Sequence, residues 1–385
     1  GMIAMDHMYH DHREDKERQG DQLQEMLMNV GPAWITQSYV GSYGPVINPV
    51  AACATALVSV SIGVDLIQQK KADFIVAGGY DDYSEEGAIG FQDMAATCST
   101  DEMLERGISP AGMSRPNDSR RGGFVEAQGG GTLLLTRLDK AIEMGLPIYA
   151  IVALAETYSD GIHTSIPAPG LGLLGAARNG FEKSPLGQAL QRFGLTADDI
   201  TVVSKHDTST AANDPNENKL HHLIQTTLKR DPGNPLLVHS QKSILGHAKG
   251  GAGAWQSIAA IQMMQTGLVP GNRNLEDVDP AMRAYPTLSF SDETLSLGKK
   301  SIAAVLMTSL GFGHVGSISL FIHPEKALSL LSAKEFEEYG KKRAPREFYH
   351  KQKSQRALME KTAWFQKRKD RPKEEEEIRL LLEPK

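Results

Sequence analysis

Residues 45–67 read PVINPVAACATALVSVSIGVDLI, and this stretch decides the fold. Its first part, residues 45–52, is an apolar run of strand length and predicts a buried strand that leads directly into Cys53. Over residues 57–67, apolar side chains cover most of a helical surface, which predicts a helix enclosed by the core. A strand, a cysteine and a buried helix in immediate succession indicate helices packed on sheets.

The rest of the chain alternates between strand and helix patterns. A charged helix is predicted over residues 139–144, with Gly145 as its C-cap residue. Strands are predicted at residues 74–76, 132–136, 148–157, 201–204, 302–308 and 317–322, the last two forming a hairpin. This alternation predicts an α/β fold in layers. Residues 325–385 depart from it because they are dense in Lys, Arg and Glu, and they predict a charged tail of surface helices or an interaction segment.

Composition and charge exclude several classes of function. The chain has 385 residues, 40% of them hydrophobic, and a formal net charge of −6, which gives no reason to expect a nucleic-acid partner. No apolar run reaches transmembrane length, and the start lacks a signal pattern, so no membrane association is expected. Two cysteines cannot form a disulfide framework, which predicts a cytoplasmic protein. His7, His10 and His12 fit no common metal-ligand spacing and are expected to be solvated.

Cys53 lies at the predicted junction of strand and helix, among the small residues of AACATA at positions 51–56. The first N–H groups of a helix lack partners and carry partial positive charge, which favours a thiolate and can hold an oxyanion. A cysteine among alanines and valines is more often a small core residue, so Cys53 alone leaves both interpretations open. Cys98 has no such junction and is interpreted as structural.

Two histidines and a lysine extend this set. His206 follows a short strand and opens the hydroxyl-rich stretch HDTST at residues 206–210. Lys242 begins, and His247 ends, the stretch KSILGH, and glycines follow it at a predicted helix start. Either histidine alone is more often structural than catalytic. Together with Cys53 they supply a nucleophile and two groups that move protons or donate hydrogen bonds, as acyl chemistry requires.

These stretches resemble the motifs of β-ketoacyl synthases, which are condensing enzymes of the thiolase fold. Residues 52–56 resemble the nucleophile motif of the family. Residues 206–210, with Asp214 and Glu217 after them, resemble its first histidine motif, and residues 242–247 resemble its second. Further matching stretches are MSRP at 113–116, GFVE at 123–126 and GFG at 311–313. Three stretches resemble more specifically the synthase domain of type I fatty acid synthases of fungi and actinobacteria. They are GYDD at 79–82, PAPG at 167–170 and GHAKGGAGAW at 246–255.

The resemblance implies a thiolase-like, layered α-β-α-β-α fold built from two similar halves. Residues 1–146 are then the remainder of an N-terminal half that carries the nucleophile, residues 147–324 the C-terminal half with both histidines, and residues 325–385 the charged helical tail. Family members carry a much longer stretch before the nucleophile than the 52 residues found here. The first strands of the N-terminal half are therefore expected to be missing, which would expose core faces and sheet edges.

The resemblance also implies a catalytic role for four side chains. Cys53 would take an acyl group from an acyl-carrier-protein thioester, with the N–H groups of Cys53 and Phe312 holding the oxyanion. His206 and His247 would stabilise the enolate that forms when malonyl thioester loses carbon dioxide. Lys242 is expected to orient His247 and to add positive potential.

Further residues are expected to support this reaction. Thr208 and Thr210 would position the pantetheine arm of the carrier, and Phe312 would gate the cavity, while Asp214 and Glu217 would hold the loop. The family requires no metal and no bound cofactor, because the pantetheine belongs to the acyl carrier protein. A homodimer within a larger megasynthase is the implied assembly.

Two positions depart from the motifs of the family, and three alternative interpretations of the function remain. Gln256 stands where stand-alone bacterial synthases have a glutamate paired with the motif lysine, and HVGS at residues 314–317 replaces a glycine-rich turn that ends in Thr-Asn. Thiolases replace the second histidine with a cysteine, and plant-type polyketide synthases have an asparagine at the position of His247, so both are disfavoured. The third alternative is an inactive fragment or structural part of a fatty acid megasynthase.

Overall fold

The computed structural model describes residues 2–16, 24, 27–41, 43–161, 170–360 and 374–383. The chain divides into two compact units, one of Pro49–Lys342 and one that combines Gly1–Asn48 with Arg343–Lys385. The boundaries expected near residues 146 and 324 both fall inside the first unit, and the predicted division into two halves and a tail stays a prediction. Residues 167–169 of the quoted PAPG stretch lie outside the described residues.

A six-stranded sheet forms the centre of the larger unit, Pro49–Lys342. Its strands are, in spatial order, β3 (Ile151–Ser159), β10 (Val315–Ile322), β9 (Ala304–Gly311), β4 (Ile200–Ser204), β5 (Leu236–His239) and β7 (Leu288–Phe290). Strand β10 runs antiparallel to both of its neighbours, β3 and β9, and β4, β5 and β7 run parallel to β9. Because β4 and β5 are parallel neighbours, their C-terminal ends lie side by side, and the residues that follow the two strands are brought together there.

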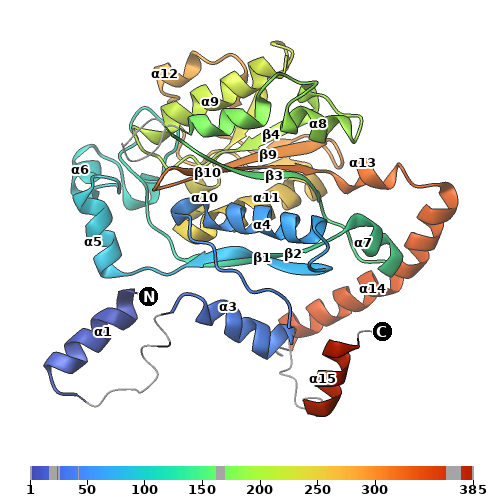
Figure 1. Ribbon diagram of the computed structural model, residues 1–385. Coiled ribbons are helices and arrows are strands. Elements are labelled where there is room, and N and C mark those ends of the chain that lie inside the picture. The colour runs from blue at the N-terminus through green and yellow to red at the C-terminus, as the bar shows by residue number, and fades with distance from the viewer. Residues whose placement is uncertain are drawn as a thin grey trace. The chain divides into compact units, whose positions relative to one another are not determined.

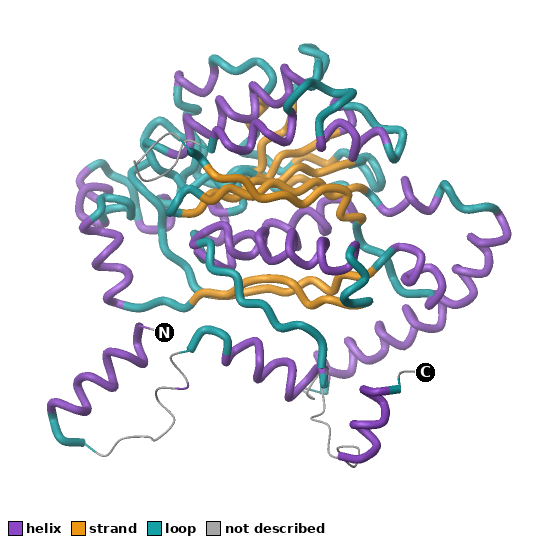
Figure 2. The backbone as a smooth tube through the Cα atoms, in the orientation of Figure 1, coloured by secondary structure: helices purple, strands orange, loops and turns teal. Residues whose placement is uncertain are grey.

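Helices cover both faces of this sheet (Figures 1 and 2). Helices α8 (Pro185–Gln191) and α9 (Asn213–Thr227) lie on one face, and α4 (Thr55–Gln68) and α11 (Ala252–Thr266) lie on the other. A second, antiparallel sheet of β1 (Phe74–Asp81) and β2 (Gly129–Thr136) packs on the far side of α4 and α11. The predicted layering of sheets and helices is therefore confirmed.

Shorter elements connect these layers. They are α5 (Glu85–Asp93), α6 (Thr100–Glu105), α7 (Leu138–Met144), α10 (Lys242–Leu245), α12 (Pro280–Arg283), α13 (Pro324–Leu328) and the paired strands β6 (Leu268–Val269) and β8 (Leu295–Ser296). Helix α7 ends at Gly145, whose φ of 65° lies in the left-handed region, as the sequence predicted for this C-cap. The hairpin of β9 and β10 is also confirmed.

Helix α4 is enclosed by both sheets, as its apolar sequence predicts. Leu57, Val60 and Ile67 are buried, and Leu57 packs in a cluster with residues of β4, β9 and β10. The hydroxyl of Ser61 donates to the carbonyl of Ala155 in β3 at 3.1 Å, which attaches the helix to the larger sheet. The middle of α4 is thereby fixed against the sheet whose strand β4 leads to His206.

The strand predicted over residues 45–52 is wrong. The segment before Cys53 is irregular, and Val46, Ile47 and Val50 are exposed. Pro45 and Pro49 have no N–H to donate to a sheet, and no partner strand lies beside the segment among the described residues. A 3₁₀ turn of Ala52–Ala54 leads into α4 instead.

The two-stranded sheet is covered on one face only. Leu135 and Ala77 point inward against α4, while Val76 and Leu134 are 49% and 67% exposed. This alternation is typical of a sheet with one solvent-facing side. The outer face of this sheet therefore presents apolar side chains, while the expectation that strands of the N-terminal half are missing stays a prediction.

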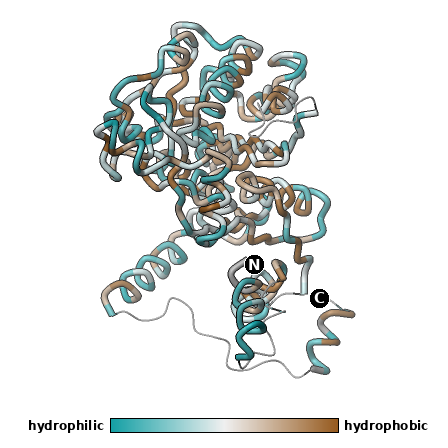
Figure 3. Tube along the Cα trace, turned by 90° about the vertical axis from the view of Figure 1, so that its left-hand side faces the viewer, coloured by the Kyte–Doolittle hydropathy of each residue, from teal (hydrophilic) through white to brown (hydrophobic). Residues whose placement is uncertain are grey.

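The second unit contains helices α1 (Met2–Arg13), α3 (Val30–Ile35) and α15 (Glu374–Leu382), and a π-helical turn, Thr36–Val40. Helix α14 (Ala333–Met359) begins in the larger unit, where Tyr339 donates to the carbonyl of Leu146 at 2.8 Å, and continues into the second. It is mostly hydrophilic along its length (Figure 3), in agreement with the predicted charged helical tail. None of the helices in the described part of the chain is long and apolar enough to cross a membrane.

Candidate active site

Cys53 lies in the 3₁₀ turn directly before α4. Ala52 adopts a φ of 45°, a left-handed conformation that is unfavourable for a residue with a Cβ atom. Such a strained turn at a helix start points the next side chain away from the helix, as in a nucleophile elbow. Gly311 at the end of β9 lies against this turn, where a Cβ atom would collide with the carbonyl oxygen of Ala51. The backbone after Gly311 is thus placed beside Cys53.

Both predicted histidines lie next to this thiol. His247 Nε2 is 3.1 Å from Cys53 Sγ, and the rings of His206 and His247 are edge to face with centroids 5.2 Å apart. One ligand atom from each of the three residues lies within 4.8 Å of the others, and all three side chains are buried. Cys53 and His247 are 194 positions apart in sequence, so their contact is created by the fold.

The backbone of His247 is held by the segment that precedes β2. The His247 N–H donates to the carbonyl of Val125 at 2.8 Å, and the N–H of Ala127 donates to the His247 carbonyl at 3.1 Å. These two bonds form a short parallel bridge between Glu126 and His247. The resembling stretch GFVE therefore contributes through its backbone.

His206 follows β4 and is held on both sides of its backbone. Its N–H donates to Glu217 Oε1 of α9 at 2.5 Å, and Lys242 Nζ donates to its carbonyl at 2.5 Å. Lys242 Nζ and Ser309 Oγ each lie 3.4 Å from His206 Nδ1. The orienting contact expected between Lys242 and His247 is therefore made with His206, because α10 places the ammonium beside the end of β4.

Burial dominates the electrostatics of these groups. It raises the pKa of the Cys53 thiol to about 11, and the positive charges of Lys242 and Lys249 act in the opposite direction. Burial, followed by repulsion from Lys242, lowers the pKa of His206 and of His247 well below the usual value. Burial thus raises the pKa of the thiol and lowers the pKa of each imidazole, whereas the helix start alone suggested a lowered thiol pKa.

The remaining predicted residues lie around this centre. Phe312 follows Gly311, and its ring lies 6.0 Å from that of Phe91, which in turn contacts Phe124 beside His247. Thr208 Oγ1 and Thr210 Oγ1 are 3.1 Å apart, and Thr210 also accepts from the N–H of Asn213. Their predicted roles in gating and in binding pantetheine stay predictions.

Asp214 and Glu217 face the protein interior from α9. Glu217 accepts hydrogen bonds from the N–H groups of His206 and Asp207, so it holds the loop after β4. Asp214 accepts from the N–H of Asn117 at 3.0 Å, which attaches a second loop to α9. Cys98 lies apart from this centre, in a small cluster with Met103 and other apolar residues.

Comparison with known proteins agrees with this geometry. The family model of the β-ketoacyl synthase N-terminal domain matches residues 2–141, and that of the C-terminal domain matches residues 149–276. The chain belongs to the β-ketoacyl synthase family. The N-terminal match contains Cys53, and the C-terminal match contains His206 and His247.

Proteins that are similar to this chain include subunits of fungal fatty acid synthases. The chain is 45% identical over 344 residues to fatty acid synthase alpha subunit stcJ of Emericella nidulans, covering 89% of this chain and 22% of that protein. It is 34% identical over 439 residues to fatty acid synthase subunit alpha of Saccharomyces cerevisiae, covering 91% and 23%. The chain thus spans less than a quarter of the length of these relatives.

The fold is shared with a solved ketosynthase structure. FabY from P. aeruginosa superposes with a TM-score of 0.79 at 23% sequence identity, over 90% of this chain and 55% of that one. The thiolase-like layered fold implied by the resemblance is therefore confirmed.

The two departures from the synthase motifs have structural explanations. Gln256 is buried in α11, and its Nε2 donates to the carbonyls of Ser204, Lys205 and Thr308 at 3.1, 2.9 and 3.1 Å. A neutral amide therefore ties the ends of β4 and β9 together. His314 lies in the turn between β9 and β10 with a φ of 67°, a conformation that the altered turn sequence must accommodate.

The three reactive side chains also form a candidate set of metal ligands. A thiolate and two imidazoles within 4.8 Å of one another are ligands that zinc accepts. The ammonium groups of Lys242 and Lys249 place positive charge near this set, which disfavours a cation. The sequence prediction of a site without metal stays a prediction.

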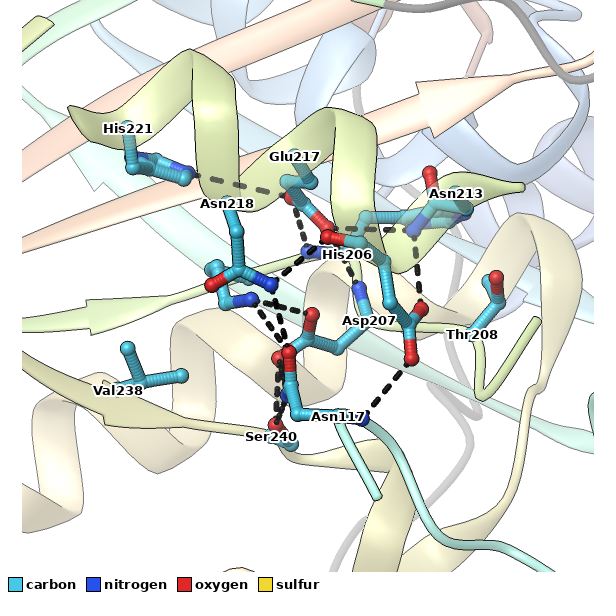
Figure 4. A network of polar contacts seen from close by, with 12 residues as sticks. Asn117, His206, Asp207, Thr208, Asn213, Glu217, Asn218, His221, Val238 and Ser240 are labelled. Carbon is cyan, nitrogen blue, oxygen red and sulfur yellow. Dashed lines mark hydrogen bonds and ion pairs between the residues drawn. The ribbon is translucent and has the colours of Figure 1, made fainter. Parts of the chain in front are cut away.

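Sequence reasoning missed the polar network that supports His206. Figure 4 shows this network at the ends of β4 and β5, where side chains from α9 and from the loop of Asn117 meet. It contains Asn117, Lys205, Asp207, Asn218 and Ser240. The one available signal was the run of three ionisable residues, 205–207, directly after a buried strand, where a charged side chain needs a partner.

Proposed function

We propose that this chain is a β-ketoacyl-[acyl-carrier-protein] synthase that condenses malonyl thioester with an acyl group held on Cys53. The observation that carries the proposal is the convergence of Cys53, His206 and His247 within 4.8 Å at the start of a buried helix. Membership of the synthase family agrees with this chemistry. The reaction would serve fatty acid biosynthesis, as the names of the fungal relatives suggest.

The first step transfers the acyl group to the protein. His247 Nε2, 3.1 Å from Cys53 Sγ, accepts the thiol proton as the sulfur attacks the thioester carbonyl. The oxyanion is held by the N–H groups of Cys53 and Phe312, which the close approach of Gly311 to the turn brings together. The pantetheine thiolate then leaves and takes up the proton from His247, so that acyl-Cys53 and a free carrier thiol result.

The second step forms the carbon–carbon bond. The carbonyl of the malonyl thioester accepts hydrogen bonds from His206 and His247, so the enolate is stabilised as carbon dioxide leaves. Neutral imidazoles suit this role because each carries one N–H donor. The enolate carbon attacks acyl-Cys53, the C–S bond breaks, and Cys53 is released as a thiolate that takes up a proton from water.

The proposal includes the partners implied by this chemistry. The acyl and malonyl groups arrive on the phosphopantetheine of an acyl carrier protein, whose arm passes Thr208 and Thr210, and no metal or bound cofactor takes part. We place the chain in a homodimer within a cytoplasmic megasynthase. The support is the set of fungal fatty acid synthase relatives, of which this chain spans only a part.

Labelling of Cys53 tests the proposal directly. The chain is incubated with cerulenin, a thiol-directed synthase inhibitor, and the modified cysteine is located by mass spectrometry. Modification at Cys53, with Cys98 unmodified, is the expected result. A folded sample labelled only at Cys98, or at neither cysteine, would favour the alternative of an inactive or structural part of a megasynthase.

A further inference from the structure

Two oppositely charged side chains flank His206 in the sequence and form a buried ion pair. Lys205 Nζ lies 2.7 Å from Asp207 Oδ1, and both side chains are fully buried. Isolated charges in such a place are strongly unfavourable, so each residue depends on the other. Because they are the residues immediately before and after His206, the pair closes a loop of the chain around the backbone of that histidine.

The carboxylate of Asp207 joins three further elements to this loop. Its Oδ2 accepts from Asn117 Nδ2 at 2.9 Å and from Ser240 Oγ at the end of β5 (Figure 4). Asn117 Oδ1 in turn accepts from Lys205 Nζ at 3.0 Å and from Asn218 Nδ2 of α9 at 2.8 Å. The loop, β5 and α9 are therefore all linked to the two residues beside His206.

The backbone at Asp207 is strained. Its φ of 37° lies in the left-handed region, which costs a residue with a Cβ atom free energy unless surrounding contacts enforce it. The N–H of Asp207 donates to Glu217 Oε2 at 2.8 Å, and the carboxylate is fixed by the contacts given above. These contacts hold the turn that directs the imidazole of His206 toward Cys53 rather than along the strand.

We propose that Lys205 and Asp207 are positioning residues of the condensation reaction, which act as one unit by fixing the turn that carries His206. This inference rests on the proposed function, since it assigns His206 to the decarboxylation step. The pair touches neither Cys53 nor His247 in the contacts of the described residues. Its removal therefore changes the second step of the reaction and leaves the transfer of the acyl group to Cys53 intact.

The test measures the two half-reactions separately in the full chain. Formation of acyl-Cys53 from an acyl-pantetheine thioester is followed by intact mass spectrometry, and carbon dioxide release is followed with malonyl-pantetheine. The variants are Asp207→Asn, Lys205→Met and the double variant with both changes. Asparagine tolerates the left-handed backbone, so Asp207→Asn removes the charge and leaves the turn accessible. Arg230→Met serves as the control, because Arg230 is also buried but donates only to carbonyls far from the site.

Each single variant is expected to lower decarboxylation by about 10- to 100-fold, as expected when a catalytic group shifts by roughly 1 Å. Acylation of Cys53 is expected to stay near the rate of the unmodified chain. The double variant is expected to lose much less than the product of the two single losses, because no unpaired charge is left buried. Arg230→Met is expected to lower thermal stability without changing the ratio of the two half-reactions.

Additive losses in the double variant, or equal losses in both half-reactions, would overturn the positioning role. If a single variant does not fold, the double variant alone decides, because a folded double variant with lowered decarboxylation and retained acylation supports the pair as a unit. A folded double variant in which the ratio of the two half-reactions equals that of the unmodified chain contradicts it. An unmodified chain that performs neither half-reaction would overturn the proposed function itself, which is a distinguishable result.

Discussion

The two sheets of the larger unit differ in how completely they are buried, and the reactive residues follow that difference. Every residue of β9 and all but the first residue of β10 are buried, whereas β1 and β2 alternate between covered and exposed positions. His206 follows a strand of the first sheet, and its supporting network lies at that edge. The position of His206 therefore depends on a frame that is closed on both faces, whereas the backbone of His247 is held by the segment before β2.

Cys53 depends on both sheets, because α4 lies between them. Ser61 of α4 donates to β3 of the larger sheet, and Ser59 accepts from the N–H of Gly78 in β1. The nucleophile is thus attached to a rigid layer on one side and to a half-covered layer on the other. Loosening of the smaller sheet should therefore disturb Cys53 and His247 more readily than it disturbs His206.

The largest expected effect comes from Cys53, the predicted nucleophile at the start of α4. Cys53→Ala removes the nucleophile, and we expect condensation to fall on the order of 10⁴-fold or more. Decarboxylation of malonyl-pantetheine is expected to persist, because the two histidines remain in place. Both rates are measured with pantetheine thioesters, and Cys98→Ala, at the second free cysteine, serves as the matched control. Condensation that survives in Cys53→Ala would refute the assignment of the nucleophile.

A matched pair of leucines on β2 tests the difference between the two faces of the smaller sheet. Leu135 packs against α4, and Leu134 is 67% exposed. We expect Leu135→Ala to lower the free energy of unfolding by about 2–4 kcal/mol, and Leu134→Ala to change it by no more than about 0.5 kcal/mol. Urea unfolding measures both. Equal losses would show that the outer face of this sheet is covered in the folded protein in solution.

The sequence predicted the parts of the molecule that local pattern determines. The hydrophobic period identified α4, and turn residues identified α7 with Gly145 and the hairpin of β9 and β10. The motifs located Cys53, His206 and His247 before any geometry was known. The predictions of these elements are confirmed because short-range pattern carries the information, and the three motif residues converge in the structure, while their catalytic roles stay predictions.

The sequence could not predict features that depend on partners distant in the chain. Residues 45–52 have the composition of a buried strand, but a strand needs a neighbouring strand, and the described residues provide none. Lys242 was assigned to His247 because both belong to one motif, whereas the fold places its ammonium against His206, 36 positions away. The contact of Asn117 with Asp207 joins residues 90 positions apart, and no periodicity reports it.

A smaller effect is expected when Lys242, which lies beside His206, is changed and the pKa of Cys53 is measured. Its positive charge lowers the pKa of Cys53, so Lys242→Met is expected to raise that pKa further. The pH profile of alkylation of Cys53 by iodoacetamide should move to higher pH, with a loss of about tenfold near pH 8 if the shift is about one unit. Lys219→Met, at an exposed position on α9, serves as the control. A profile that stays in place or moves to lower pH would contradict the influence of Lys242.

The smallest expected effect concerns Asp214, which is buried on α9 beside the polar network that supports His206. Burial, followed by repulsion from Asp207, raises the pKa of the Asp214 carboxyl to about 7, against about 3.9 in an unfolded chain. Between these pH values the folded protein keeps a proton that the unfolded chain has lost. The contribution of Asp214 to stability therefore decreases as pH rises from about 4 to 7, and remains unfavourable above that range.

Asp214→Asn removes this titration and keeps an oxygen that can accept from the N–H of Asn117. We expect the variant to unfold at a temperature roughly 2–4 °C higher than the unmodified chain near pH 8, and to show a smaller difference near pH 5. Thermal unfolding followed by circular dichroism at both pH values measures this. A lower melting temperature near pH 8 would mean that the negative charge of Asp214 is needed by Arg121, 3.8 Å away. The closed region would then be stabilised by charge pairing at this residue, and Asp214 would act like Asp207 in holding the loops around His206.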